Sequence, residues 1–351
     1  MHSIATVIRR LAAVATVALT ACTSGGVAPS ESQATASAPS TRPSLELPAN
    51  GTPAAAASGA IDLSTLTGRI AFSGGSPGAE DVYVVNADGT GLRRVTTDPE
   101  AQFDPTWSPD GRRIAYRYQK GTDFMTTDIY LANADGSGAT ILTRSAGSVD
   151  WGPAWSPDGS RIAWNSDRDD PGGGVLHGFL MNPDGSSATR IPVDVWVEYP
   201  AWSPDGTRIA FMGQTPEGTE NYEIYVMSAD GTGLRRLTDS PASDGFPSWS
   251  PDGGKIAFTS TRDDCSISEA PDCRTTGDIG PYHTLYTMNA DGSGVRRVTD
   301  TFAQFVDWSP DGEYLVFSPG LNIVRPDGSG LTSLDVAVGE PEFPDWIGTA
   351  G

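Results

Sequence analysis

The chain has 351 residues and a formal net charge of −21 at pH 7, because 44 acidic residues outnumber 23 basic ones. This balance argues against binding to nucleic acid or to an anionic membrane through a basic face. The three histidines and three cysteines are scattered along the chain, which argues against a zinc site built from clustered His and Cys ligands.

Residues 1–22 have the features of a bacterial export signal. Arg9 and Arg10 precede the apolar stretch from Leu11 to Thr20, which is too short for a permanent membrane span. The four residues that end in Cys22 (Leu-Thr-Ala-Cys) are similar to the bacterial lipobox, and the resemblance implies cleavage before Cys22 and lipid attachment there. In the alternative, this is an ordinary secretory peptide and Cys22 is incidental. We expect an exported protein that is held only by its lipid on the cell membrane or outer membrane and faces the periplasm or exterior.

Residues 23–60 consist largely of Ser, Thr, Pro, Ala and Gly. Few large apolar side chains are present whose burial could offset the entropy of folding, so this composition predicts a disordered tether. Residues 61–351 are long enough to form one closed domain, which we expect to be monomeric.

Five copies of the string Trp-Ser-Pro-Asp-Gly recur at intervals of 48, 47, 47 and 59 residues; they begin at Trp107, Trp155, Trp202, Trp249 and Trp308. A period near 47 with several short strands in each unit is typical of a β-propeller, whose blades are four-stranded sheets around an axis. In each unit the Trp strand and its turn are followed by an Ile-Ala-aromatic strand, an Ile-Tyr strand, an Asp-Gly turn and an outer strand.

The Asp-Gly turn occurs six times and the Trp turn only five. The chain enters the array at Gly68 to Phe72, which already reads as a second strand, whereas Glu342 to Trp346 reads as a Trp strand with nothing after it. The sequence therefore predicts an all-β, six-bladed propeller of four-stranded antiparallel blades, in which the C-terminal strand with Trp346 closes the ring and leaves no open edge.

The Trp-Ser-Pro-Asp-Gly, Ile-Ala-Phe, Ile-Tyr and Asn-Ala-Asp-Gly units resemble the repeats of TolB-type β-propellers over residues 68–348. The resemblance implies a non-enzymatic scaffold that binds a protein, peptide or glycan of the cell envelope. Similar repeats also occur beside peptidase domains and in some carbohydrate-active proteins. The protein after which the family is named carries an extra N-terminal α/β domain, where this chain has the predicted tether.

Binding is expected on the propeller face that carries the variable loops, because both short turns of each unit lie on the opposite face. Six residues just ahead of the innermost strands should rim the central channel on that face: Gln102, Asp150, Glu198, Asp244, Gln304 and Glu342. Four of them are acids, and a ring of carboxylates can hold Ca²⁺ or attract a cationic partner segment. The alternative is a solvated rim on an acidic protein that needs no other cofactor.

The fifth blade carries the largest insertion, from Asp264 to Tyr282. In an exported protein Cys265 and Cys273 are expected to form a disulfide, with free thiols as the alternative. The bridge either only staples a long loop or also preorders a recognition surface. That surface would hold the acids at 263, 264 and 269, with the histidine of the third-blade loop as a further candidate: Asp263, Asp264, Glu269 and His177.

No catalytic constellation stands out from the repeats. Gly74 to Gly78 matches the G-x-S-x-G string of serine hydrolases, but a loop between two strands lacks the strand-to-helix elbow that this motif requires. His177 and His283 are the candidate general bases. A binding scaffold is therefore the first hypothesis. The second is a carbohydrate-active lyase or lactone hydrolase that uses the rim acids, His177 and a divalent cation.

Overall fold

The computed structural model describes residues 59–121, 126–144, 147–170, 175–214, 221–264 and 283–349. The chain divides into two units, Met1–Thr52 and Pro53–Gly351, and every described element belongs to the second. Cys22, Cys265, Glu269 and Cys273 lie outside the described residues, as does most of the predicted tether. The described part of the chain holds no helix of the length and apolarity that a membrane span requires.

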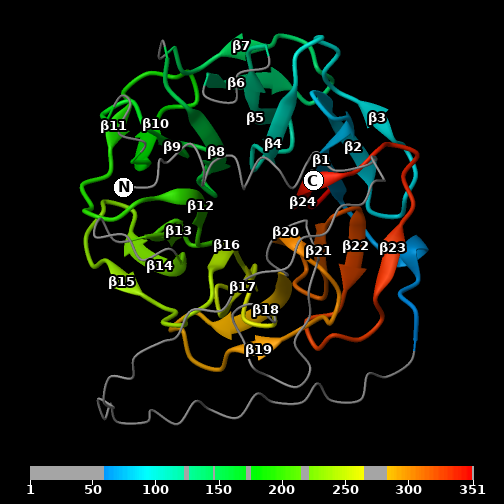
Figure 1. Ribbon diagram of the computed structural model, residues 1–351. Coiled ribbons are helices and arrows are strands. Elements are labelled where there is room, and N and C mark those ends of the chain that lie inside the picture. The colour runs from blue at the N-terminus through cyan, green and yellow to red at the C-terminus, as the bar shows by residue number, and fades with distance from the viewer. Residues whose placement is uncertain are drawn as a thin grey trace, which may run out of the picture. The chain divides into compact units, whose positions relative to one another are not determined.

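Six four-stranded antiparallel sheets surround a common axis, as the propeller prediction requires (Figure 1). Blade 1 consists of β24 (Glu342–Ile347), β1 (Arg69–Ser76), β2 (Ala79–Asn86) and β3 (Arg93–Arg94). Blade 2 consists of β4 (Gln102–Trp107), β5 (Arg113–Gln119), β6 (Thr127–Asn133) and β7 (Thr140–Ile141). Blade 3 consists of β8 (Asp150–Trp155), β9 (Ile162–Ser166), β10 (His177–Met181) and β11 (Thr189–Arg190).

The second half of the ring repeats this order. Blade 4 consists of β12 (Glu198–Trp202), β13 (Arg208–Gly213), β14 (Glu223–Ser228) and β15 (Arg235–Arg236). Blade 5 consists of β16 (Asp244–Trp249), β17 (Lys255–Ser260), β18 (Thr284–Asn289) and β19 (Arg296–Arg297). Blade 6 consists of β20 (Gln304–Trp308), β21 (Leu315–Ser318), β22 (Leu321–Val324) and β23 (Thr332–Leu334). One short 3₁₀ helix, η2 (Leu63–Thr65), precedes blade 1.

The C-terminal strand closes the ring, as predicted. β24 pairs antiparallel with β1, and its register places Trp346 opposite Ile70 and Ile347 opposite Arg69. Blade 1 therefore takes its innermost strand from one end of the propeller sequence and its other three strands from the opposite end, which removes a free inner edge.

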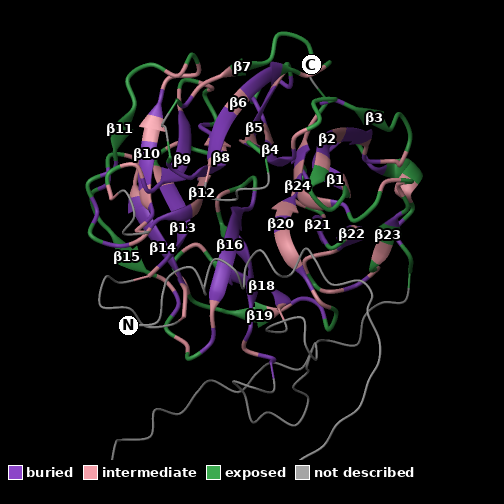
Figure 2. Cartoon of the chain, turned by 45° about the horizontal axis from the view of Figure 1, so that its top comes forward, coloured by how far each residue is buried: buried purple, intermediate pink, exposed green. Residues whose placement is uncertain are grey.

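The hydrophobic core lies between neighbouring blades. In the second strands of blades 1 to 5 the Ile and the aromatic residue face one way and the Ala between them faces the other, as the period of two dictates; blade 6 has Leu315, Val316 and Phe317 at these positions. Ala115 of blade 2 thus packs in one cluster with Trp155 and Ile162 of blade 3. A small residue at that position leaves room for the indole of the next blade. The two-residue strands β3, β11 and β15 are exposed at the outer edge, whereas the middle strands are largely buried (Figure 2).

The two repeated turns owe their form to local hydrogen bonds. In the first Trp turn the Ser108 hydroxyl donates to Asp110 (2.6 Å) and accepts from the Arg113 N–H (2.9 Å). The Asp-Gly turn packs against the preceding blade. A Cβ on Gly136, whose φ is +87°, would lie only 2.1 Å from the Val95 carbonyl oxygen, so only glycine allows this approach.

Candidate functional site

All six residues of the predicted rim begin an innermost strand, but they do not form one level. Three of them pair with the residue four positions after the first apolar residue (Ile or Leu) of the second strand: Gln102 with Tyr118, Asp150 with Ser166 and Asp244 with Ser260. The other three pair with the residue three positions after it: Glu198 with Met212, Gln304 with Ser318 and Glu342 with Ser73. The strands pair alike in all six blades, but three of these residues lie five positions before the repeat tryptophan and three lie four before it, so they occupy two neighbouring levels.

Two of the four rim acids are bound to arginines. Arg168 Nη2 lies 2.9 Å from both carboxylate oxygens of Asp150, and Arg262 Nη2 lies 2.9 and 2.8 Å from those of Asp244. Both carboxylates are fully buried. Their charge is neutralised within the blade, so these acids hold the loops after β9 and β17 in place.

The other two rim acids, Glu198 and Glu342, are largely shielded from water, and neither forms an ion pair with an arginine of the described chain. Burial raises the pKa of Glu198 to about 7, although a hydrogen bond with Tyr222 opposes the shift. Burial also raises the pKa of Glu342 to about 7, and the neighbouring carboxylates of Glu340 and Glu80 add to it. Both groups therefore titrate near neutral pH rather than forming a permanently charged rim.

The described residues of the predicted recognition loop are buried. Asp263 accepts hydrogen bonds from Thr284 Oγ1 and from the Tyr286 hydroxyl (2.9 Å), and Asp264 is only 4% exposed. His177 begins β10 and is half-buried, and burial lowers its pKa. Burial likewise lowers the pKa of His283 to about 4, so both imidazoles are neutral at pH 7.

Each innermost strand has one residue with a left-handed backbone conformation, three positions before its repeat tryptophan. Each innermost strand bulges there, and φ lies between +37° and +60° at all six positions: Asp104, Gly152, Tyr199, Phe246, Phe305 and Phe343. Proline follows five of these six residues. Only one of the six is glycine, so this conformation costs free energy at the other five and is maintained by the closed ring.

Four of these six residues are aromatic and pack against one another on the axis. The ring centroids of Phe305 and Phe343 are 3.7 Å apart, those of Phe246 and Phe305 4.5 Å, and those of Tyr199 and Phe246 4.9 Å. Side chains from blades 1, 4, 5 and 6 thus form an aromatic layer inside the channel, which consists of Tyr199, Phe246, Phe305 and Phe343.

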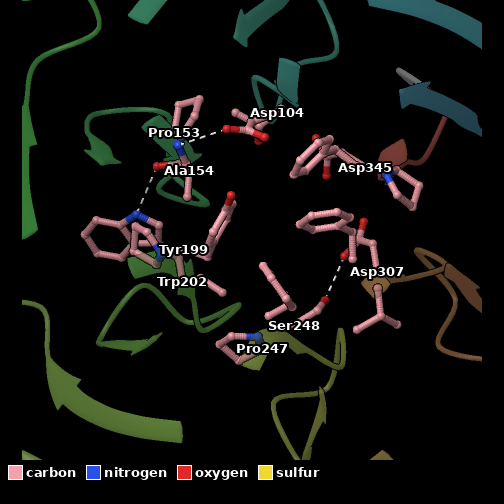
Figure 3. Close-up of a pocket in the computed structure, with 18 of the residues that line it drawn as sticks. Asp104, Pro153, Ala154, Tyr199, Trp202, Pro247, Ser248, Asp307 and Asp345 are labelled. Carbon is pink, nitrogen blue, oxygen red and sulfur yellow. Dashed lines mark hydrogen bonds between the residues drawn. The ribbon is translucent and has the colours of Figure 1, made fainter. Parts of the chain in front are cut away.

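A cavity of about 270 Å³ adjoins the aromatic layer (Figure 3). Its lining runs from the aromatic layer to the repeat tryptophans, and includes Trp155, Trp202 and Trp249. It therefore lies in the half of the channel that leads to the Ser-Pro-Asp-Gly turns. From the variability of the loops, binding was predicted on the opposite face of the propeller.

Two carboxyl groups on the cavity wall are hydrogen-bonded to each other, Asp307 of β20 and Asp345 of β24. Asp307 also accepts from Ser248 Oγ (2.7 Å) and from the Trp346 N–H (2.7 Å), and Asp345 accepts from the Trp107 N–H. In Figure 3 the two acids lie side by side across from Tyr199. The pair thereby joins the innermost strands of blades 5, 6, 1 and 2.

A hydrogen bond between two carboxyls requires that one of them carries a proton. Burial raises the pKa of both groups, and the neighbouring Asp307 charge raises that of Asp345 further, well above its ordinary value. Asp307 has more donors around it, so the proton resides on Asp345 and the pair carries one negative charge. Two carboxyl groups that share a buried site in this way titrate as a coupled pair.

A third acid reaches the edge of the same cavity. Asp104 accepts from the Gly152 N–H (3.4 Å) through Oδ2, which also lies 3.3 Å from Arg117 Nε, while its buried Oδ1 has no hydrogen-bond partner. Burial raises the pKa of Asp104. The cavity wall thus presents negative charge and one unsatisfied acceptor beside an aromatic layer, which suits a positively charged or hydrogen-bond-donating group.

The sequence analysis did not single out the acid pair, although a signal was present. Asp precedes the repeat tryptophan only in Val306-Asp307-Trp308 and Pro344-Asp345-Trp346, whereas Thr, Ala or Ser precedes it in the other blades. When two repeats carry the same unusual residue at the same position, the two residues are candidates for a common role. The two positions are adjacent in space because β24 lies between β20 and β4 around the ring.

For metal binding, the described residues contain no group of three or more His, Cys, Asp and Glu side chains arranged to hold an ion. The Ca²⁺ expectation stays a prediction. For serine-hydrolase chemistry, Gly74 to Gly78 forms the end of β1 and the turn into β2, which is a hairpin and not a strand-to-helix elbow.

The blade structure and the closure by β24 define a six-bladed β-propeller with a pocket in its central channel, and its repeats are similar to those of TolB-type propellers. The family model of the TolB β-propeller domain matches residues 192–266. The Tol-Pal system protein TolB of Desulfosudis oleivorans is 30% identical over 77 residues, which are 22% of this chain and 17% of that protein. The chain thus matches about a sixth of the length of this curated relative.

Solved structures show the same fold. TolB from Acinetobacter baumannii superposes with a TM-score of 0.62 at 23% identity, over 82% of this chain and 67% of that one. An oligogalacturonate lyase in complex with manganese superposes with a TM-score of 0.50 at 15% identity, over 79% of this chain and 75% of that one. Because the fold is found in TolB and in a lyase, the function has to be argued from the site.

Proposed function

We propose that the protein is an exported lipoprotein of the bacterial cell envelope whose propeller is a non-enzymatic binding scaffold for a protein or peptide. The observation that carries the proposal is the cavity between the aromatic layer and the repeat tryptophans, with the hydrogen-bonded acids on its wall. A cavity of this size holds one side chain or a short segment, and its wall favours a cationic one such as Lys or Arg. The match to a Tol-Pal system protein supports an envelope partner.

The binding site is tested by photo-crosslinking in the native cell. A photoreactive phenylalanine replaces Ala154, which lines the cavity, and in a control it replaces Leu234, which is exposed on the outer rim. A discrete adduct from position 154 alone is the expected result and identifies the partner. Adducts only from position 234 would remove the cavity from the proposal.

Lipid anchoring is tested separately by metabolic labelling with an alkyne fatty acid. The unmodified chain should incorporate label and sediment with membranes, whereas Cys22→Ser should lose the label and become soluble after export. An unlabelled, soluble wild-type protein would overturn the anchoring part of the proposal and leave the binding part intact.

A second candidate function is catalysis, and the acid pair is the observation that favours it. One carboxyl that carries a proton beside one that does not can act as general acid and general base. A lyase or lactone hydrolase would then use Asp307 and Asp345 rather than the rim acids Asp150 and Asp244, which are bound to arginines. Turnover of an envelope polysaccharide or lactone by the wild type, and its loss in Asp307→Asn with Asp345→Asn, would favour this candidate over the scaffold.

A further inference from the structure

A repeated contact ties the outer edge of one blade to the next. In blades 1, 4 and 5 the first arginine of the outer strand donates to a main-chain oxygen of the following blade's Asp-Gly turn: Arg93 to Ala134 (2.6 Å), Arg235 to Asp291 (3.2 Å) and Arg296 to Asp327 (3.1 Å). The exposed guanidinium thus links the outer edges of two neighbouring blades.

Blade 2 lacks this arginine. Thr140 pairs with Leu131 where Arg93 pairs with Val84, and Ile141 stands in the place of Arg94. No long cationic side chain from β7 therefore reaches the turn of blade 3. Two other blades also lack the arginine, but there the side chains of Pro192 and Leu334 pack against the turn glycines of the next blade.

A groove of about 710 Å³ lies at this boundary between blades 2 and 3. Its apolar part comes from Leu131 and Ile141, and its far wall from Pro183 of the next blade. Asp184 at the edge is engaged, since its carboxylate accepts from the Ser186 N–H (2.9 Å) and hydroxyl (2.6 Å). The Leu142 backbone still packs against Gly185 of blade 3, so the groove is a recess where only the arginine contact between the two blades is missing.

The groove is basic on an otherwise acidic protein. Arg113 and Arg144 both line it, and among the described residues neither guanidinium forms a hydrogen bond or ion pair; Arg113 lies over the Trp155 ring at 4.9 Å. Unpaired guanidinium groups beside apolar side chains complement carboxylates flanked by apolar residues. Electrostatic complementarity therefore selects the occupant.

We infer that this groove is a second docking site, which binds an extended acidic peptide segment of a protein partner. A partner carboxylate lies between Arg113 and Arg144, and a neighbouring apolar side chain contacts Leu131 and Ile141. The site is separate from the central cavity, so it extends the proposed scaffold function to a second surface and does not depend on the acid pair.

The test measures fluorescence anisotropy of a labelled Gly-Glu-Leu-Glu-Leu-Glu-Gly peptide with the full chain. Saturable, salt-sensitive binding is expected for the wild type and is not expected for a peptide with Lys in place of Glu. Arg144→Glu should weaken binding by about tenfold or more, the effect of losing one charge-assisted contact. Arg190→Glu makes the same charge change on the exposed strand β11 and should have little effect.

A second variant separates the groove from general charge attraction. Thr140→Arg with Ile141→Arg introduces the pair found in blades 1, 4 and 5, so that the new arginine can reach the Pro183 carbonyl as Arg93 reaches that of Ala134. Closing the groove should weaken peptide binding by about tenfold even though positive charge is added. Tighter binding to this variant, equal binding to Arg144→Glu, or no saturable binding to the wild type would overturn the inference.

Discussion

At the scale of single residues, the two acids of the cavity are chemically unequal although they occupy equivalent positions in neighbouring blades. Asp307 receives donors on both oxygens, from Ser248 on one and Trp346 on the other. Asp345 accepts from the Trp107 N–H and from the Thr106 hydroxyl, and it carries the shared proton toward Asp307. The amide of an asparagine can take the place of the protonated Asp345, but it cannot accept on both sides as Asp307 does.

The Asn variants of these two acids should therefore behave differently. Asn at position 345 can donate to Asp307 and still accept from Trp107, so Asp345→Asn should leave the free energy of unfolding nearly unchanged at pH 7. Asp307→Asn turns an NH₂ group toward a donor and should lower the free energy of unfolding by about 1–3 kcal/mol. Urea unfolding measures both, with Asp194→Asn at an exposed position as control. Equal losses would contradict the assigned proton position.

At the scale of elements, β24 combines two roles that the other innermost strands perform separately. It completes the sheet of blade 1 through its pairing with β1, and its Trp346 is part of the cluster that also contains Ile70 and Phe72. It also supplies Phe343 to the aromatic layer and Asp345 to the acid pair. Ring closure and site assembly are therefore coupled.

Removal of residues 342–351 should destabilise the entire propeller rather than one edge. The deletion exposes the inner edge of β1 and removes a core tryptophan, so the melting temperature should fall by roughly 10 °C or more with loss of a sharp transition. Removal of residues 349–351 leaves β24 intact and should change little. Thermal melts followed by tryptophan fluorescence measure both truncations, and an unchanged melt for the longer one would show that β24 does not close the ring in solution.

At the scale of the whole molecule, opposing pKa shifts predict a stability maximum in mildly acidic solution. Hydrogen bonds to the turn carboxylates lower the pKa of Asp158 and of Asp205 to about 2, so their contribution is present above the unfolded pKa and is lost as pH falls toward 2. Glu198 and Glu342 have pKa values raised from 4.5 to about 7, so the free energy of unfolding falls as pH rises from about 4.5 to about 7 and levels off above that pH.

Melting temperatures at constant ionic strength should therefore peak at about pH 4–5, decline to about pH 7 and change little between pH 8 and 9. Glu198→Gln imitates the protonated side chain, and it should flatten the decline by up to about 3 kcal/mol, the value of a shift from 4.5 to about 7. Glu313→Gln, on an exposed turn, serves as the matched control. A melting temperature that rises steadily to pH 8 would contradict the raised pKa values.

The fold was predictable because its determinants are local and repeated. The turns require Pro, Asp and Gly at set places, the Ile-Ala-aromatic pattern has the period of a strand, and the count of turns shows that blade 1 lacks its own Trp strand until Trp346. The starts of all six innermost strands, from Gln102 to Glu342, were also placed correctly from this pattern.

The site was not predictable in the same way, because its parts meet only when the ring is closed. The one-residue difference among the rim residues can be read from the sequence, because three of them lie five residues before the repeat tryptophan and three lie four before it. The arginines that bind Asp150 and Asp244, in contrast, become their partners only in the folded blade. Asp307 and Asp345 belong to different blades, and the channel removes them from water and forces them to share a proton. Local sequence chemistry thus determines the blades, whereas burial and proximity across the closed ring decide which acids are paired, protonated or free to bind.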